Sequence, residues 1–211
     1  MTAHRSTLRR DAAAAVATAA AVVLAACGSD NASTGHSGHG TQSSPSASAS
    51  ASEGTRNADD VSFAQGMIPH HRQAVEMADL AATRATSKEV KDLAVEIKKA
   101  QDPEIKTLTG WLTSWGEDVP AEGDMEHSGH GGHGMAGMMT PEQMEELEKS
   151  SGRAFDTAFL EMMIEHHKGA VAMAETEQKN GFHGPAKSMA EEIITTQNAE
   201  IDRMNKLLGK K

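Results

Sequence analysis

The 211-residue chain has one cysteine, no tyrosine, two tryptophans and four phenylalanines. A single cysteine excludes an internal disulfide, so further soft metal ligands have to be Met or His side chains. The formal net charge of −10 repels phosphate groups, and the few aromatic side chains give bases little surface on which to stack. Nucleic acid is therefore not an expected partner.

Two metalloenzyme motifs are also missing. Di-iron four-helix bundles need Glu-x-x-His on two helices, and many zinc proteases need His-Glu-x-x-His. Neither pattern occurs in the chain. We therefore expect no catalytic residues, with a metal-dependent oxidase acting on Cu(I) as an open alternative.

The first 26 residues are typical of an export signal, because Arg5, Arg9 and Arg10 precede an alanine-rich apolar run. The run ends in Leu24-Ala25-Ala26-Cys27, which resembles a bacterial lipobox. We predict a lipoprotein signal peptide at residues 1–26 and, at 27–57, a lipidated Cys27 followed by a disordered Ser/Ala/Gly-rich tether. The domain is then extracytoplasmic and anchored to the membrane of the cell envelope through the lipid.

Two halves of the chain repeat each other at a constant offset of 96 residues. FAQGMIPHHRQAVEMA at 63–78 aligns with FLEMMIEHHKGAVAMA at 159–174. Residues 58–112 paired with 154–208 contain 19 identities in 55 pairs. Such internal repetition indicates a duplicated structural unit.

Each unit is predicted to form two helices, because apolar residues recur at helical spacing in both segments. Since one helix hairpin cannot bury its apolar stripe alone, two copies predict an all-α four-helix bundle with pseudo-twofold symmetry. The expected divisions are repeat 1 at 58–118, a Met/His-rich loop at 119–140 and repeat 2 at 141–211. Expected helix starts are a Thr86–Glu89 capping box, Thr140-Pro141 and Gly184-Pro185, with a break at Ser150–Gly152 and kinks at Pro69 and Pro103.

Polar residues that recur in both copies are harder to explain by packing than apolar ones. In repeat 1, Asp60, Met67 and His71 share one helical face, and His70 and Met77 lie on a second stripe about 100° away. The predicted bundle ligands are these five residues and their copies, Asp156, Met163, His166, His167 and Met173. Gln101, Glu104, Gln197 and Glu200 are predicted to hold the far imidazole N–H groups. The alternative is a buried polar network that fixes helix register without a metal.

The segment MEHSGHGGHGMAGMM at 125–139 combines three histidines and four methionines with five glycines. A glycine-rich backbone lets such a loop wrap around an ion, although a plain linker is the alternative. The predicted loop ligands are Met125, His127, His130, His133, Met135, Met138 and Met139.

Ligand softness selects the metal. Thioether sulfur is a poor ligand for Mg²⁺, Ca²⁺, Mn²⁺ and Zn²⁺ but suits Cu(I), and imidazole binds copper in both oxidation states. We expect a copper-binding protein that sequesters or delivers copper, with Cu(I) favoured over Cu(II) and zinc a weaker alternative. A copper donor or acceptor protein is then an expected partner. A non-metal envelope scaffold is the other alternative.

The repeated Met-Ile-x-His-His motifs at 67–71 and 163–167, each followed by Ala-Val-x-Met-Ala, resemble the bacterial family called domain of unknown function 305. Gln101-x-x-Glu104-Ile105, its copy at 197–201, and Trp111 with Trp115 strengthen this resemblance. It covers residues 58–211 and implies a ferritin-like fold. The family includes a periplasmic copper-binding protein, so the resemblance implies copper sequestration or delivery. The matching positions are Met67, His70, His71, Met163, His166 and His167.

Overall fold

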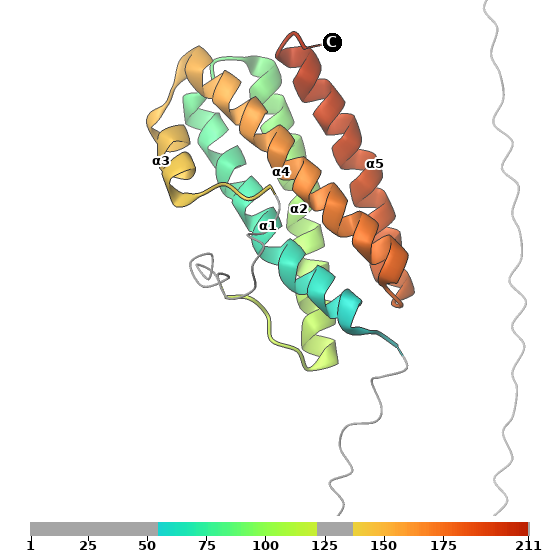
Figure 1. The fold of residues 1–211 in the computed structure, drawn as a ribbon. Helices are drawn as coiled ribbons and strands as arrows, with labels where there is room; N and C mark the ends of the chain where they lie inside the picture. The colour runs from blue at the N-terminus through green and yellow to red at the C-terminus, as the bar shows by residue number, and fades with distance from the viewer. Residues whose placement is uncertain (1–54, 122–136, 211) are drawn as a thin grey trace, which may run out of the picture. The chain divides into compact units, whose positions relative to one another are not determined.

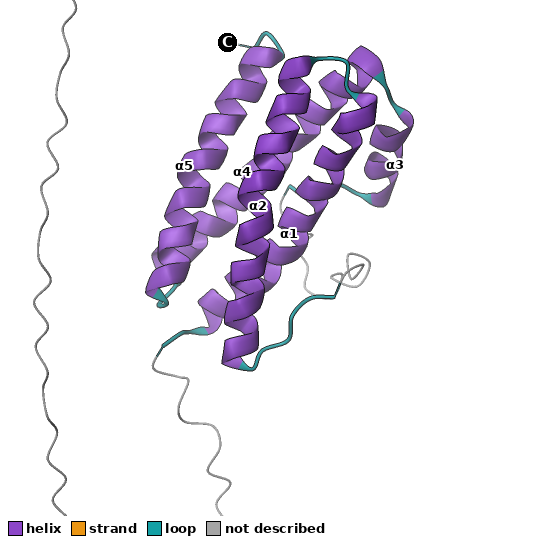
Figure 2. Cartoon of the chain, turned by 180° about the vertical axis from the view of Figure 1, so that it is seen from behind, coloured by secondary structure: helices purple, strands orange, loops and turns teal. Residues whose placement is uncertain are grey.

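The computed structural model describes residues 55–121 and 137–210, and all regular structure in these ranges is helical. The helices are α1 (Ala58–Arg84), α2 (Lys88–Trp115), α3 (Pro141–Lys149), α4 (Gly152–Asn180) and α5 (Gly184–Leu207). The four long helices form a bundle, and the short α3 packs against α1 and α4 (Figures 1 and 2). The predicted all-α four-helix bundle is confirmed. The predicted signal, Cys27 and loop residues 125–135 lie outside the described residues.

Local sequence signals explain where most helices begin. Thr140 caps α3 in a capping box with Gln143, and α5 starts at Gly184 with a proline in its first turn. The predicted break between α3 and α4 is present, since α3 ends at Lys149 and α4 begins at Gly152. The predicted Thr86 cap is wrong by one residue, because the Ser87 side chain accepts the hydrogen bond from the Val90 amide. Both α1 and α2 continue through their internal prolines.

The two repeats pack with α1 and α4 running antiparallel along one another. Within each repeat the helices pair, α1 with α2 and α4 with α5, and the extensive contacts between α1 and α4 join the repeats. In Figure 1, α1 rises from lower right to upper left and α4 returns in the opposite direction. A pseudo-twofold axis therefore crosses the α1–α4 contact.

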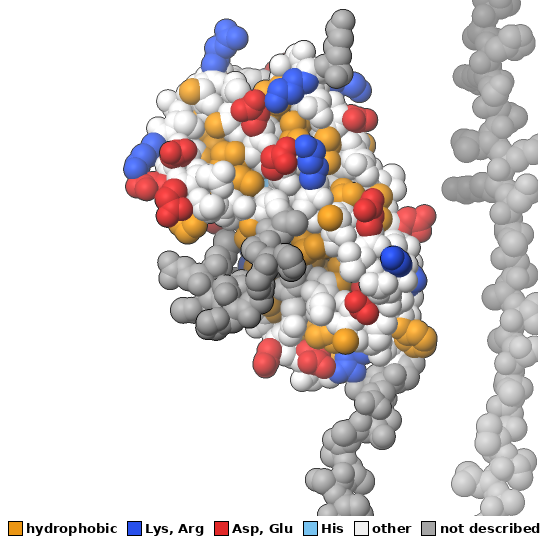
Figure 3. All heavy atoms as spheres, viewed as in Figure 1, with side chains coloured by type: hydrophobic (Ala, Val, Ile, Leu, Met, Phe, Trp, Pro, Cys, Tyr) orange, Lys and Arg blue, Asp and Glu red, His pale blue; other side chains and the backbone are white. Residues whose placement is uncertain are grey.

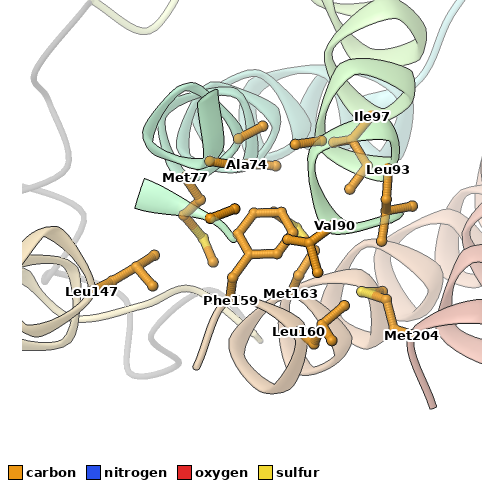
Figure 4. Close-up of a cluster of buried hydrophobic side chains, with 14 of the residues drawn as sticks. Ala74, Met77, Val90, Leu93, Ile97, Leu147, Phe159, Leu160, Met163 and Met204 are labelled. Atoms are coloured by element: carbon orange, nitrogen blue, oxygen red, sulfur yellow. The ribbon is translucent and has the colours of Figure 1, made fainter. Parts of the chain in front are cut away.

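The buried apolar side chains fall into two clusters. The first includes Met77, Phe159 and Met163 (Figure 4), and the second includes Phe63, Met67 and Ile193. On the face seen in Figure 3, acidic and basic side chains are mixed with small apolar patches. Within the described ranges, no helix has an apolar stretch of the length needed to cross a membrane.

Candidate metal centre

Four histidines lie in the interior where α1 and α4 cross. The side chains of His70, His71, His166 and His167 are fully buried. The rings of His70 and His166, which are repeat counterparts, pack on each other with centroids 3.7 Å apart and an angle of 40° between their planes. The pseudo-twofold axis therefore passes close to this histidine pair.

The second histidine of each helix lies against a carboxylate from the partner helix of its own repeat. His71 Nε2 is 2.7 Å from Glu104 Oε2, and His167 Nε2 is 2.7 Å from Glu200 Oε2. His167 and Glu200 form a hydrogen bond, whereas His71 and Glu104 are only within ion-pair distance, because His71 Nε2 has no hydrogen-bond partner among the described residues. The bond to Glu200 favours the tautomer of His167 with the proton on Nε2, which leaves its Nδ1 lone pair free. Nδ1 of both rings is buried and, among the described residues, has no hydrogen-bond partner. These two nitrogens are therefore available to a metal ion.

Burial and the neighbouring rings favour the neutral form of His166. Burial lowers the pKa of His166 well below its usual value, and the neighbouring His70, His167 and His71 lower it further. The backbone of His70 favours the charged form, but this contribution is outweighed. Neutral imidazole is the form that binds metals.

Methionine side chains flank the histidines on both sides. Met67, Met77 and Met163 are fully buried, whereas Met173 is half-buried. Met77 and Met163 pack in the first cluster, and Met67 and Met173 in the second. Each cluster therefore contains one of these methionines from α1 and one from α4.

Asp60 and Asp156, which were predicted as metal ligands, accept hydrogen bonds from backbone amides instead. Asp60 accepts hydrogen bonds from the amides of Phe182 and His183, at 3.0 and 2.8 Å, in the α4–α5 connection. Asp156 accepts from the amides of Thr86 and Ser87, at 3.1 and 3.0 Å, in the α1–α2 connection. Each aspartate therefore ties its own repeat to the turn of the other repeat.

Helix geometry explains this difference. Asp60 and His71 share a face, but eleven residues separate them, which is about 16 Å along the helix axis. One metal ion cannot join groups so far apart. Burial alone would raise the pKa of Asp60, but the hydrogen bonds from Asn57, His183 and Phe182 outweigh it and hold the pKa below its usual value.

The remaining predicted residues differ in burial and in hydrogen bonding. Gln101 and Gln197 are buried one turn before Glu104 and Glu200, and their Oε1 atoms have no hydrogen-bond partner among the described residues. Met138 is half-buried and Met139 is buried against the bundle. Gln73, which was not among the predicted residues, forms two hydrogen bonds with the backbone of Met139. The only sequence signal for Gln73 is that its counterpart in repeat 2, Gly169, differs.

Nitrogen and oxygen ligands alone do not complete a site in the described part of the chain. Within residues 55–121 and 137–210, no three His, Cys, Asp or Glu side chains gather closely enough to hold one metal ion. Besides imidazole, the buried donors that the described part of the bundle offers include the thioether sulfurs of Met67, Met77 and Met163. This donor set favours a soft ion over Zn²⁺ or Mg²⁺.

The repeated histidine motifs and the paired helices correspond to a known family. The model of the family described as "Domain of unknown function (DUF305)" matches residues 60–208. The chain belongs to the DUF305 family. No curated protein matches the chain significantly.

Solved DUF305 structures have the same fold. A candidate secreted DUF305 protein from Streptomyces coelicolor is 34% identical, with a TM-score of 0.63, over 72% of this chain and 92% of that one. A DUF305 fragment from Deinococcus radiodurans is 28% identical, with a TM-score of 0.64, over 74% and 98% of the two chains.

A third similar protein, CopM, has been crystallised with metal. Its Cu(II)-bound form is 35% identical to this chain, with a TM-score of 0.60, over 70% of this chain and 94% of CopM. CopM has also been solved in Cu(I)-bound, Ag-bound and apo forms.

Proposed function

We propose that this DUF305 protein binds copper outside the cytoplasm and buffers it or hands it to another protein. The observation that carries the proposal is the group of four buried histidines, two of which have Nε2 2.7 Å from a carboxylate, His71 from Glu104 and His167 from Glu200. A carboxylate that fixes the ring of a metal-binding histidine is a common arrangement, because it sets the tautomer and raises the basicity of the ligand.

The choice of copper rests on the sulfur atoms beside these histidines. Imidazole and thioether together suit Cu(I), and imidazole also serves Cu(II). CopM, which is 31–35% identical to this chain, has been solved with Cu(I), Cu(II) and Ag bound, and this supports copper as the metal of the proposed site. Thioethers carry no proton to lose, so a site rich in Met keeps its ligands in acid.

The location is also a proposal. The candidate secreted relative supports export, and the predicted lipid on Cys27 would hold the bundle at the membrane through the tether. Met125, His127, His130, His133 and Met135 would then form a capture arm that collects copper for the bundle. A donor or acceptor protein completes this route.

The test is a Cu(I) titration of the purified chain against a competing chelator. The matched variant replaces the Met and His residues at 125–135 with Ser and leaves residues 137–139 unchanged. We expect the variant to lose part of the copper stoichiometry and to keep tight binding in the bundle. Binding that vanishes in the variant would assign copper to the loop alone, and the buried histidines would then be a structural network.

A further inference from the structure

The hydrogen bonds between the repeats differ at one buried position. Both Asp60 and Asp156 accept from two backbone amides of the connection in the other repeat. Beside Asp60, α4 contributes Glu177, whose side chain is 1% exposed. The repeat counterpart of Glu177 is Ala81, which is fully buried on α1. Since one repeat has alanine at this position, the duplicated fold does not require a buried acid there.

The carboxyl groups of Asp60 and Glu177 are in contact. The two side chains form a hydrogen bond with each other, which requires a proton on one of them. Asp60 already accepts from three backbone amides, those of Asn57 at 2.5 Å, Phe182 at 3.0 Å and His183 at 2.8 Å. No nitrogen or hydroxyl group of the described residues donates to either oxygen of Glu177. The proton therefore belongs on Glu177, and the negative charge belongs on Asp60.

The surrounding charges agree with this placement. Burial and the contact with Asp60 raise the pKa of Glu177 to about 8, and Asp59 on α1 acts in the same direction. Lys187 on α5 favours the charged form, but its effect is outweighed. Its ammonium group donates to the carbonyl oxygen of Gly181 at 3.3 Å. Glu177 is therefore protonated in the folded protein at neutral pH.

The α4–α5 connection covers the Glu177 carboxyl group. A Cβ atom on Gly181 would overlap Oε1 of Glu177, so glycine allows the backbone to pack directly on the acid. In Figure 1 this connection and the start of α1 lie at the same end of the bundle. They are joined through Asp60 and through the Asn57 side chain, which donates to the carbonyl oxygen of Asn180 at 2.8 Å. Movement of the connection would expose Glu177 to water.

We propose that Asp60 and Glu177 share one proton, and that loss of this proton to water releases the α4–α5 connection from the start of α1. With the proton present, Glu177 donates to Asp60. Without it, two negative charges lie side by side in a buried place, which favours a form in which the connection has moved and Glu177 is hydrated. This proton-sensitive contact is a conformational device at one end of the bundle. It does not depend on the proposed function.

The direction of the pH effect follows from linkage. In the closed form Glu177 titrates near pH 8, whereas in the open form it is hydrated and returns to the ordinary glutamate pKa of 4.5. The closed form therefore binds the proton more tightly, and the ratio of open to closed molecules rises with pH between these two values. It should rise by about tenfold per pH unit and level off above about pH 8.

Amide hydrogen exchange of the purified full chain, followed residue by residue by NMR, measures this opening. The amides of Phe182 and His183, which Asp60 accepts, exchange when the connection moves. After correction for the intrinsic effect of pH on exchange, we expect their protection to fall by about tenfold per pH unit between about pH 5 and 8. The amides of Thr86 and Ser87 are the control within the same molecule, and their protection should be almost unchanged.

Substitutions at Glu177 test which group carries the proton. Glu177→Gln keeps a donor for Asp60 without a proton to lose, and Glu177→Ala makes the position the same as Ala81 in the other repeat. In both variants the protection of the α4–α5 connection should no longer depend on pH. Glu175→Gln makes the same change two residues away on the exposed face, and it should keep the wild-type dependence.

Two results would overturn the inference. One is a wild-type chain in which protection of Phe182 and His183 depends on pH no more than protection of Thr86 and Ser87. The other is a pH dependence that persists in Glu177→Gln, because the proton would then belong to another group.

Discussion

His70 and His166 lie ring against ring at the centre of the bundle, with centroids 3.7 Å apart and both side chains excluded from water. Two imidazolium ions cannot share this place at low cost, because both rings are buried and two positive charges at this distance repel each other. The pair is therefore suited to neutral rings or to a bound cation. This relationship leads to the first prediction.

The metal-free protein should lose stability as the pH falls below about 6.5. The pKa of His166 is well below its usual value in the folded protein, so the unfolded chain binds more protons in this range. The free energy of unfolding should drop by up to about 1.4 kcal/mol per pH unit for this group. Urea unfolding between pH 5 and 7 measures the slope, and His166→Gln should reduce it. An unchanged slope in that variant would contradict the assignment.

Glu177 should have the opposite effect at higher pH. Its side chain is 1% exposed, and burial and the neighbouring Asp60 raise its pKa to about 8. The folded protein then binds more protons than the unfolded chain between about pH 4.5 and 8, so Glu177 lowers stability as the pH rises through this window. Glu177→Gln keeps a hydrogen-bond donor for Asp60 without a proton to lose.

The Glu177→Gln protein should therefore be more stable than the wild type at pH 8, and the two should approach one another near pH 5. Glu175→Gln is the control, because the same change is made two residues away on the exposed face. A gain at pH 8 that is equal in both variants would show that surface charge, rather than the buried acid pair, is responsible.

The carboxylates beside the histidines should matter for metal binding more than other repeated acids. Glu104→Gln and Glu200→Gln should each lower Cu(I) affinity by about 10–100-fold, because the imidazole loses the negative charge 2.7 Å from its Nε2. Glu96→Gln and Glu192→Gln are matched controls, since these acids are also identical in the two repeats but are exposed. Chelator competition compares the four variants. Equal affinities would contradict the role of Glu104 and Glu200 in supporting the metal-binding histidines.

The aspartates at the helix starts should matter for folding and not for copper. Asp156→Ala removes two hydrogen bonds from a carboxylate that is 8% exposed. We expect a loss of about 2–4 kcal/mol in the free energy of unfolding. Cu(I) affinity, measured below the new melting temperature, should be unchanged. A large fall in affinity would restore Asp156 to the ligand set.

Much of the architecture could be predicted from the sequence because the chain is duplicated. The offset of 96 residues showed which helices correspond in the two repeats. The identity of Glu104 and Glu200 indicated that both have the same role beside a histidine. The cap at Ser87 was missed by one residue because Thr86 is an equally good capping type. These errors are local and leave the bundle unchanged.

The hydrogen bonds between the repeats, and those between Gln73 and Met139, could not be predicted in the same way. Asp60 and Asp156 bind backbone amides of distant turns, and backbone groups carry no sequence signal. A shared helical face placed Asp60 with His71, although their spacing of eleven residues already corresponds to about 16 Å along the helix axis. Gln73 was not predicted, because the comparison of the repeats selects identical residues and Gln73 corresponds to Gly169.

Copper binding by the buried histidines is tested most directly by the Cu(I) affinity of His70→Ala and His166→Ala, made in the chain whose loop Met and His residues at 125–135 are Ser. We predict that each variant loses much more binding free energy than unfolding free energy, with both measured on the same samples. Cu(I) affinity equal to that of the unmutated parent would contradict it, and the histidines would then serve only the packing of the bundle.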